Sequence, residues 1–169
     1  MRLKAMAKIN LGLDVLGKRE DGYHEVRMIM QTIRMYDILD IRKTRRPGIV
    51  LTTNLPFIPT DQRNLVYKAA QMLMEEFDVE EGLSIKLRKF IPVAAGMAGG
   101  SSDAAAAFVG VNRMFHLGLT EEQLMERAVK VGADVPYCIM RGTALAEGIG
   151  EKLTRLPEVP KCYVLIGKP

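Results

Sequence analysis

The centre of the chain carries a loop of small residues between an expected strand and an expected helix. Residues 91–103 read Ile91-Pro92-Val93-Ala94-Ala95-Gly96-Met97-Ala98-Gly99-Gly100-Ser101-Ser102-Asp103. Residues 83–88 alternate in polarity, which predicts a strand, and the Ala-rich stretch after the loop predicts a helix capped by Ser101 or Ser102. Small residues allow close approach of a ligand, and the N–H groups at a helix start favour an anion. A phosphate is therefore the natural ligand, and a flexible turn before a core helix is the equal alternative.

Strands are expected throughout the N-terminal third of the chain. Residues 1–15 alternate between apolar and polar positions, which predicts a half-buried strand. The Asp21-Gly22 pair favours a tight turn, so this strand and residues 23–35 are expected to form a hairpin. Two further short strands are expected at 37–44 and 48–53.

Helices and strands alternate in the remainder. Helical spacing predicts a helix over residues 64–77 with Asn64 as its N-cap. Thr120 and Gln123 form a capping box for another helix, which ends before Gly132, and residues 162–166 are expected to form a strand. No linker or internal repeat interrupts this order, which predicts one α+β domain over residues 1–169.

The composition is that of an ordinary globular protein. The 169 residues include 24 Lys+Arg and 20 Asp+Glu, which gives a net charge of +4, and 48% are hydrophobic. This excludes a disordered or collagen-like chain. No apolar stretch approaches the roughly 18 residues of a membrane span, and Lys4 and Lys8 interrupt the apolar run of a signal peptide. We therefore expect a cytoplasmic protein with no membrane partner, in which Cys138 and Cys162 are reduced and mostly buried.

The basic pI of 9.1 raises the hypothesis of RNA binding. The basic residues are interleaved with acidic ones and form no long run, so no nucleic-acid partner is expected from charge alone. A small positive excess suits a phosphorylated small molecule equally well.

Beyond the loop, three further sets of residues could bind a ligand or take part in catalysis. Lys8 and Asn10 point to the same side of the first strand, roughly 7 Å apart, and form either a clamp for a phosphate or hydroxyl or an ordinary solvated strand face. Tyr23 and His24 follow the expected turn and offer a stacking ring and an imidazole, although a lone His is more often structural. Asp134 follows a helix end and is a candidate general base or metal ligand, or a turn residue that bonds its own backbone.

Four stretches resemble one enzyme family in order and spacing. They are AKINLGLDVLGKREDGYHE (7–25), IPVAAGMAGGSSDAAAA (91–107), GADVPY (132–137) and TALAEGIGE (143–151). Together they resemble the 4-diphosphocytidyl-2-C-methyl-D-erythritol kinases of the GHMP kinase superfamily. The resemblance covers the N-terminal part of such a kinase. It implies an α+β fold like domain 2 of ribosomal protein S5, with helices packed on a mixed or antiparallel sheet. It also implies that the C-terminal GHMP domain is absent from this chain.

The same resemblance implies an activity and its cofactors. ATP, with Mg²⁺, would phosphorylate the 2-hydroxyl of the cytidylylated methylerythritol, a small-molecule substrate, on the non-mevalonate route to isoprenoid precursors. The isolated chain is expected to be a weak enzyme, and its oligomeric state stays open. The alternatives are an RNA-binding module of S5-like fold and a nucleotide-binding module without turnover.

The resemblance also implies roles for particular residues. Asp134 would take the proton from the substrate hydroxyl, and Lys8 would stabilise the alkoxide or the transferred phosphoryl group. Asn10, Tyr23 and His24 would contact the cytidylyl substrate, with His24 at the cytosine edge and Tyr23 stacked on it. The nucleotide-binding residues implied are Pro92, Val93, Ala94, Ala95, Gly96, Met97, Ala98, Gly99, Gly100, Ser101 and Ser102 for the triphosphate, and Asn64 and Lys89 for the adenine pocket.

Overall fold

One long central strand organises a mixed six-stranded sheet. The computed structural model describes residues 1–20, 22 and 24–167, and its strands are β1 (Arg2–Lys18), β2 (His24–Thr44), β3 (Ile49–Thr53), β4 (Gly82–Arg88), β5 (Thr143–Gly148) and β6 (Lys152–Arg155). β1 pairs with β2 along one edge, and β4 and β5 pair with different parts of its other edge. β3 runs parallel to β4, and the remaining pairs are antiparallel. The predicted α+β fold with a mixed sheet is confirmed.

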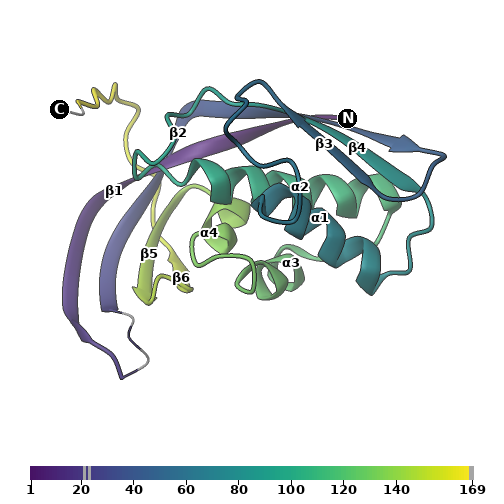
Figure 1. Cartoon of the computed structure of the whole chain (residues 1–169). Coiled ribbons are helices and arrows are strands. Elements are labelled where there is room, and N and C mark those ends of the chain that lie inside the picture. The colour runs from purple at the N-terminus through teal and green to yellow at the C-terminus, as the bar shows by residue number, and fades with distance from the viewer. Residues whose placement is uncertain (21, 23, 168–169) are drawn as a thin grey trace.

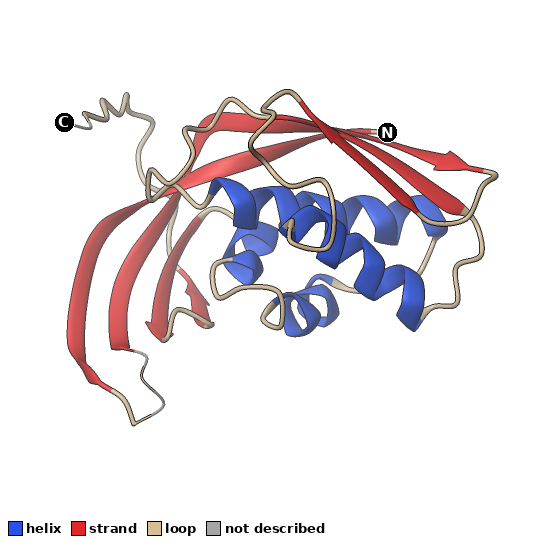
Figure 2. Cartoon of the chain, viewed as in Figure 1, coloured by secondary structure: helices blue, strands red, loops and turns tan. Residues whose placement is uncertain are grey.

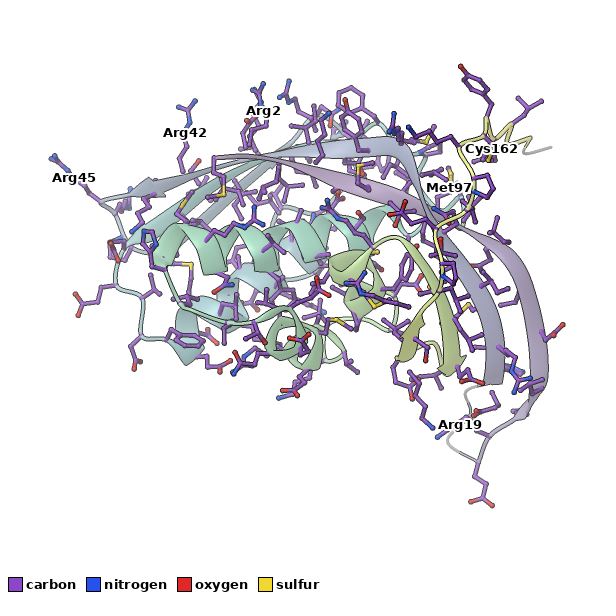
Figure 3. The ribbon with its side chains drawn as sticks, turned by 180° about the vertical axis from the view of Figure 1, so that it is seen from behind. Arg2, Arg19, Arg42, Arg45, Met97 and Cys162 are labelled. Carbon is purple, nitrogen blue, oxygen red and sulfur yellow. The ribbon has the colours of Figure 1, made fainter. Side chains whose placement is uncertain are left out.

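The helices cover one face of this sheet (Figures 1 and 2). They are α1 (Leu65–Glu76), α2 (Gly99–Phe115), α3 (Glu121–Ala128) and α4 (Val135–Met140). The small side chains 104–107 of α2 are buried and allow the helix to lie close to the sheet. On the opposite face Arg2 and Arg42 project away from the helices (Figure 3). Among the described residues, no helix is both long and apolar enough to span a membrane.

Local capping signals were reliable for two helices. The side chain of Asn64 accepts a hydrogen bond from the Val66 N–H, which confirms it as the N-cap of α1. Thr120 and Gln123 make the reciprocal bonds of a capping box at the start of α3. The prediction that Ser101 or Ser102 caps α2 is wrong. That helix begins at Gly99, after Ala98 in the left-handed conformation, with no side-chain cap.

Several predicted boundaries also differ. Residues 24–44 form one strand rather than two, because β2 has partners along both of its halves. The predicted strand at 162–166 does not form, and Cys162 is exposed rather than buried. Cys138 is buried as expected, and this burial raises the pKa of its thiol to about 12. The predicted turn at Asp21-Gly22 lies partly outside the described residues, although the two strands do form the expected hairpin.

Lys8 is buried beside an irregularity in the β1–β2 ladder. Strict alternation would place Lys8 on the opposite face from Ala5 and Ala7, yet both Ala7 and Lys8 are buried, at 0% and 5% exposure. The register with β2 shifts at this point, because Met6 pairs with Tyr36 and Lys8 pairs with Thr32. Ala7 alone therefore lies opposite residues 33–35, and the extra residues of the bulge belong to β2. Bulges of this kind often re-aim a side chain beside a functional site.

The position of the site follows from a gap in strand pairing along β2. β5 pairs with residues 26–31 and β4 with residues 38–44, so residues 32–37 have no strand on this side. The end of β4 approaches β2 at Asp37, and the α4–β5 connection approaches it at Thr32. The loop after β4 and the start of α4 are thereby placed near the middle of β1 and β2.

Candidate functional site

The loop of small residues is held in an unusual backbone conformation. Ala94, Gly96 and Ala98 have φ angles of 57°, 73° and 53°. A left-handed conformation costs an L-residue roughly 1–2 kcal/mol compared with glycine. Two alanines therefore carry strain that the surrounding structure must offset. Such strain clusters at ligand-binding sites.

We expect Ala98→Gly to stabilise the protein by about 1 kcal/mol, because glycine adopts the required conformation without the Cβ clash. The gain should appear in urea titrations as a higher midpoint of unfolding. The slope of the unfolding free energy against urea concentration should not change. Ala95→Gly is the matched control, since Ala95 lies in the same loop without a positive φ. If both variants shifted the midpoint equally, strain at Ala98 would not be the cause.

The loop and the start of α2 line a cavity of about 340 Å³. Its lining residues are Ile58, Pro59, Asn64, Leu65, Leu87, Lys89, Pro92, Val93, Ala94, Ala95, Gly96, Met97, Ala98, Gly99, Gly100 and Asp103. The first N–H groups of an α-helix lack partners within the helix, and its dipole is positive at this end. The backbone at Gly99 and Gly100 is thus suited to an anion. A Cβ on Gly100 would touch only Leu65, at 3.8 Å, so the fold leaves room for a side chain here.

Lys8 brings the candidate motifs together. Its Nζ donates to Asn10 Oδ1 at 3.0 Å and lies 3.6 Å from Asp134 Oδ2. Its backbone N–H donates to the carbonyl oxygen of Met97, at 3.2 Å, which ties β1 to the loop. Asp134 makes no capping bond to α4, so its carboxylate faces Lys8 rather than its own backbone. The side chains of Lys8 and Asp134 are 6% and 31% exposed, so the carboxylate is the partner open to a ligand.

A buried cluster of charges fastens both ends of the loop. Lys89 Nζ donates to Asp37 and, at 2.7 Å, to Asp103. The other oxygen of Asp37 accepts from the N–H groups of Phe90 and Ile91, at 2.5 and 2.8 Å. Because residues 89–91 precede the loop and Asp103 follows it, this cluster fixes the entry and the exit of the loop together.

One carboxylate of the cluster has an oxygen that lacks a hydrogen-bond partner. Asp103 is 2% exposed, and its Oδ1 has no hydrogen-bond partner. Burial raises the pKa of Asp103 well above its usual range, against the opposing attraction of Lys89, and the nearby Asp37 raises it further. A cluster with these properties beside a cavity is typical of a functional site.

The predicted nucleotide-binding residues fall into two groups. Residues 92–100, Asn64 and Lys89 line the cavity, although the ammonium of Lys89 is already held by two carboxylates. Ser101 and Ser102 are not among its lining residues. The Ser102 hydroxyl instead donates to the carbonyl oxygen of Met6, at 2.6 Å, and holds α2 against β1.

The predicted substrate residues do not all lie near Lys8. Asn10 lies beside Lys8, whereas His24 pairs with Lys18 near the far end of the hairpin. His24 is eight residues along β2 from the position opposite Lys8, which corresponds to about 26 Å at ~3.3 Å per residue. Arg19, at this end of the hairpin, lies far from Met97 (Figure 3). Tyr23 lies outside the described residues.

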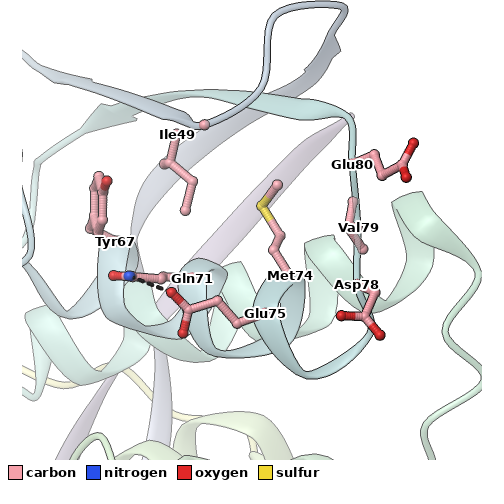
Figure 4. Close-up of a pocket in the computed structure, with 9 residues that line it drawn as sticks. Ile49, Tyr67, Gln71, Met74, Glu75, Asp78, Val79 and Glu80 are labelled. Atoms are coloured by element: carbon pink, nitrogen blue, oxygen red, sulfur yellow. Dashed lines mark hydrogen bonds between the residues drawn. The ribbon is translucent and has the colours of Figure 1, made fainter.

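A second hollow, of about 600 Å³, lies between α1 and β3 (Figure 4). Its lining combines apolar side chains with the acidic groups Glu75, Asp78 and Glu80. The carboxylates disfavour a phosphate, and Gln71 already donates to Glu75 at 2.6 Å. The cavity beside α2 is therefore the better candidate for an anion.

Comparisons with known proteins show which kinases the chain is similar to. Residues 64–142 match the family model described as GHMP kinases N terminal domain. Over the whole chain, 57% of residues are identical to a protein of Lachnospira eligens named 4-diphosphocytidyl-2-C-methyl-D-erythritol kinase. A protein of the same name from Lachnoclostridium phytofermentans is 59% identical over 99% of the chain. Through this match and these relatives the chain is similar to GHMP kinases. It spans 59% and 57% of the lengths of these two relatives.

Two solved kinase structures have a similar fold. A crystal structure of 4-(cytidine 5'-diphospho)-2C-methyl-D-erythritol kinase aligns with a TM-score of 0.81 and 35% identity, over 92% of this chain and 55% of that one. The Methanococcus jannaschii mevalonate kinase aligns with a TM-score of 0.71 and 15% identity, over 93% of this chain and 56% of that one. The second likeness concerns the fold alone.

Sequence reasoning missed the acidic members of the buried cluster. Asp37 has a detectable signal, because it shares the inward-facing parity of Leu39 and Ile41 in β2. A lone carboxylate on an otherwise apolar strand face indicates a buried partner of opposite charge. Asp103 offers no comparable signal, because it directly follows two serines at the start of a helix.

Proposed function

We propose that this chain provides the nucleotide-binding and catalytic groups for ATP-dependent phosphorylation of the 2-hydroxyl of a cytidylylated methylerythritol. The observation that carries the proposal is the position of Lys8, which contacts Asp134 through its side chain and the loop at Met97 through its backbone. A cation, a carboxylate and an anion-binding loop within one site are the components that phosphoryl transfer needs. The names of the relatives supply the substrate class, and the resemblance in sequence implies the route to isoprenoid precursors.

In the proposed reaction the loop holds the triphosphate of ATP against the start of α2. The substrate hydroxyl lies between the loop and Asp134, whose exposed carboxylate accepts its proton. Lys8 and the N-terminus of α2 stabilise the charge that develops as the γ-phosphoryl group moves. Since the protein forms no covalent bond, the rate depends mainly on how these groups are positioned.

Magnesium is proposed as the ion that enters with the nucleotide. Mg²⁺ typically takes one or two carboxylate oxygens together with phosphates and waters, and it neutralises phosphate charge. Among the described lining residues Asp103 offers a carboxylate, and its Oδ1 is without a partner. The residues present therefore fit such an ion, and Asp103 would hold it.

RNA binding on the same site is less well supported. A carboxylate beside the anion-binding loop, as Asp134 is, would repel a phosphate backbone and serves no purpose in phosphate binding alone. Asn10 and His24 remain proposed contacts of the cytidylyl substrate. His24 reaches the site only if the hairpin or the substrate spans the separation along β2.

Binding of ATP can be tested with a variant of the loop. We expect Gly100→Val to weaken ATP binding at least tenfold, because the side chain would occupy the approach of the phosphates while the fold has room for it. Calorimetry with ATP and with adenosine should show a much smaller loss for adenosine, which lacks phosphates.

The control for this experiment is Gly17→Val, since an added Cβ at Gly17 meets nothing within 4 Å and the residue lies in the hairpin. That variant should bind ATP like the parent. Equal losses for ATP and adenosine in Gly100→Val would argue against a phosphate role for the loop.

A further inference from the structure

A closed ring of hydrogen bonds joins α4 to the middle of β2. The Gly142 N–H donates to Thr32 Oγ1 at 3.1 Å, and the Tyr137 hydroxyl donates to the Gly142 carbonyl oxygen at 2.7 Å. Thr32 Oγ1 and Tyr137 Oη are 3.1 Å apart. Because the Tyr137 proton is directed to Gly142, Thr32 is the donor in this last bond. Each hydroxyl thus donates once and accepts once.

The ring is partly buried, with Tyr137 in the interior and Thr32 and Gly142 half-buried, which makes it costly to break. Tyr137 is 1% exposed, and burial raises the pKa of its hydroxyl to about 12, so the group keeps its proton at neutral pH. A buried hydroxyl without a partner loses the hydration that it has in the unfolded chain. A closed, fully satisfied ring therefore favours one arrangement of the two elements strongly.

Each side chain of the ring is close in the structure to one of the two proposed catalytic residues. Thr32 is the register partner of Lys8 in the β1–β2 ladder, and Tyr137 follows Asp134 by about one helical turn. α4 has only six residues, and so short a helix is not stable by itself. Its position, and with it the position of Asp134, must come from tertiary contacts.

We propose that Tyr137 and Thr32 are positioning residues for phosphoryl transfer, which keep Asp134 at its working distance from Lys8. They act through Asp134, because Tyr137 lies on the helix that Asp134 begins and Thr32 is bonded to Tyr137 and to Gly142 just after that helix. The inference rests on the proposed function, because it assumes that the pair Lys8 and Asp134 carries out the chemistry.

The test uses substitutions that remove one hydroxyl each. Tyr137→Phe and Thr32→Val should each lower kcat roughly tenfold, since small displacements of a catalytic group are costly in reactions governed by positioning. KM for ATP should stay close to the parent's, because the loop is unaffected. Thr32→Ser, which keeps the hydroxyl, should restore kcat. The assays should use the longest form of the protein that its gene encodes.

Thr143→Val is the matched control. Thr143 is 6% exposed and its hydroxyl donates to Gln31 Oε1 at 2.7 Å, so this variant also loses a partly buried hydrogen bond of the same sheet. That bond does not reach α4. We expect Thr143→Val to lower the unfolding temperature about as much as Thr32→Val and to leave kcat unchanged.

The outcomes separate this inference from the proposed function. If Lys8→Met kept the parent's turnover, the proposed function would be wrong. If Lys8→Met were inactive while Tyr137→Phe and Thr143→Val lowered kcat equally, the ring would have only a structural role. The double variant Tyr137→Phe/Thr32→Val should be no slower than the slower single variant, because both break one ring. Additive losses in kcat would also overturn the inference.

Discussion

Replacement of Asp134 by Asn is expected to lower turnover roughly 10²–10⁴-fold, the usual contribution of a general base. The amide has nearly the same shape but cannot take a proton from the substrate hydroxyl. Affinity for ATP should change little, because Asp134 is not among the residues that line the cavity beside α2. Steady-state kinetics with the cytidylyl substrate and calorimetry with ATP, on one preparation, measure both quantities.

The matched control is Asp61→Asn. Asp61 is an exposed carboxylate whose pKa is lowered to about 2, mainly by its hydrogen bonds with Arg63. Its replacement removes the same charge from the surface and should leave turnover unchanged. Parent-like turnover in Asp134→Asn would mean that Asp134 only accompanies Lys8 as a counter-ion.

The parts of the fold that sequence predicted correctly are those fixed by local chemistry. Asn64 and the pair Thr120 and Gln123 each satisfy N–H groups within three residues, so the sequence itself contains both partners. The start of a helix directly after the small residues of the loop was predicted for the same reason, whereas anion binding by the loop stays a prediction.

Errors arose where a partner distant in sequence decides the structure. Residues 162–166 have the composition of a strand, but a strand requires a neighbour and the described structure offers them none. The burial of Lys8 accompanies a bulge in β2 opposite Ala7, which the alternation of β1 alone cannot reveal. The charge cluster of Asp37, Lys89 and Asp103 joins three separate parts of the chain. The sequence contains a signal for the burial of Asp37 but none for that of Asp103.

The helix α4 was missed for a different reason. Its six residues are too few to establish a helical period, and Asp134 was expected only to follow a helix end. Pro136 in the first turn was the available signal, because proline is favoured at that position of a helix. Recognising the helix would have placed Tyr137 on the same element as Asp134 before the structure was known.

Replacement of Lys8 by Met should lower turnover at least 10²-fold, because it removes the positive charge beside the reacting group and keeps the length of the side chain. Lys8 is only 5% exposed, so an apolar side chain of similar length should pack in its place, and circular dichroism should match the parent. Asp134 then loses its counter-ion, but its partial exposure keeps it hydrated.

Two comparisons make this prediction specific. Lys4→Met removes a charge from the same strand, where Lys4 lies over the Tyr36 ring at 4.3 Å, and should leave turnover unchanged. The double variant Lys8→Met/Asp134→Asn should be little slower than the slower single variant, since groups that act as a unit in one reaction are not additive. A fully additive loss would mean that Lys8 and Asp134 contribute to separate steps, and an active Lys8→Met would remove Lys8 from the site altogether.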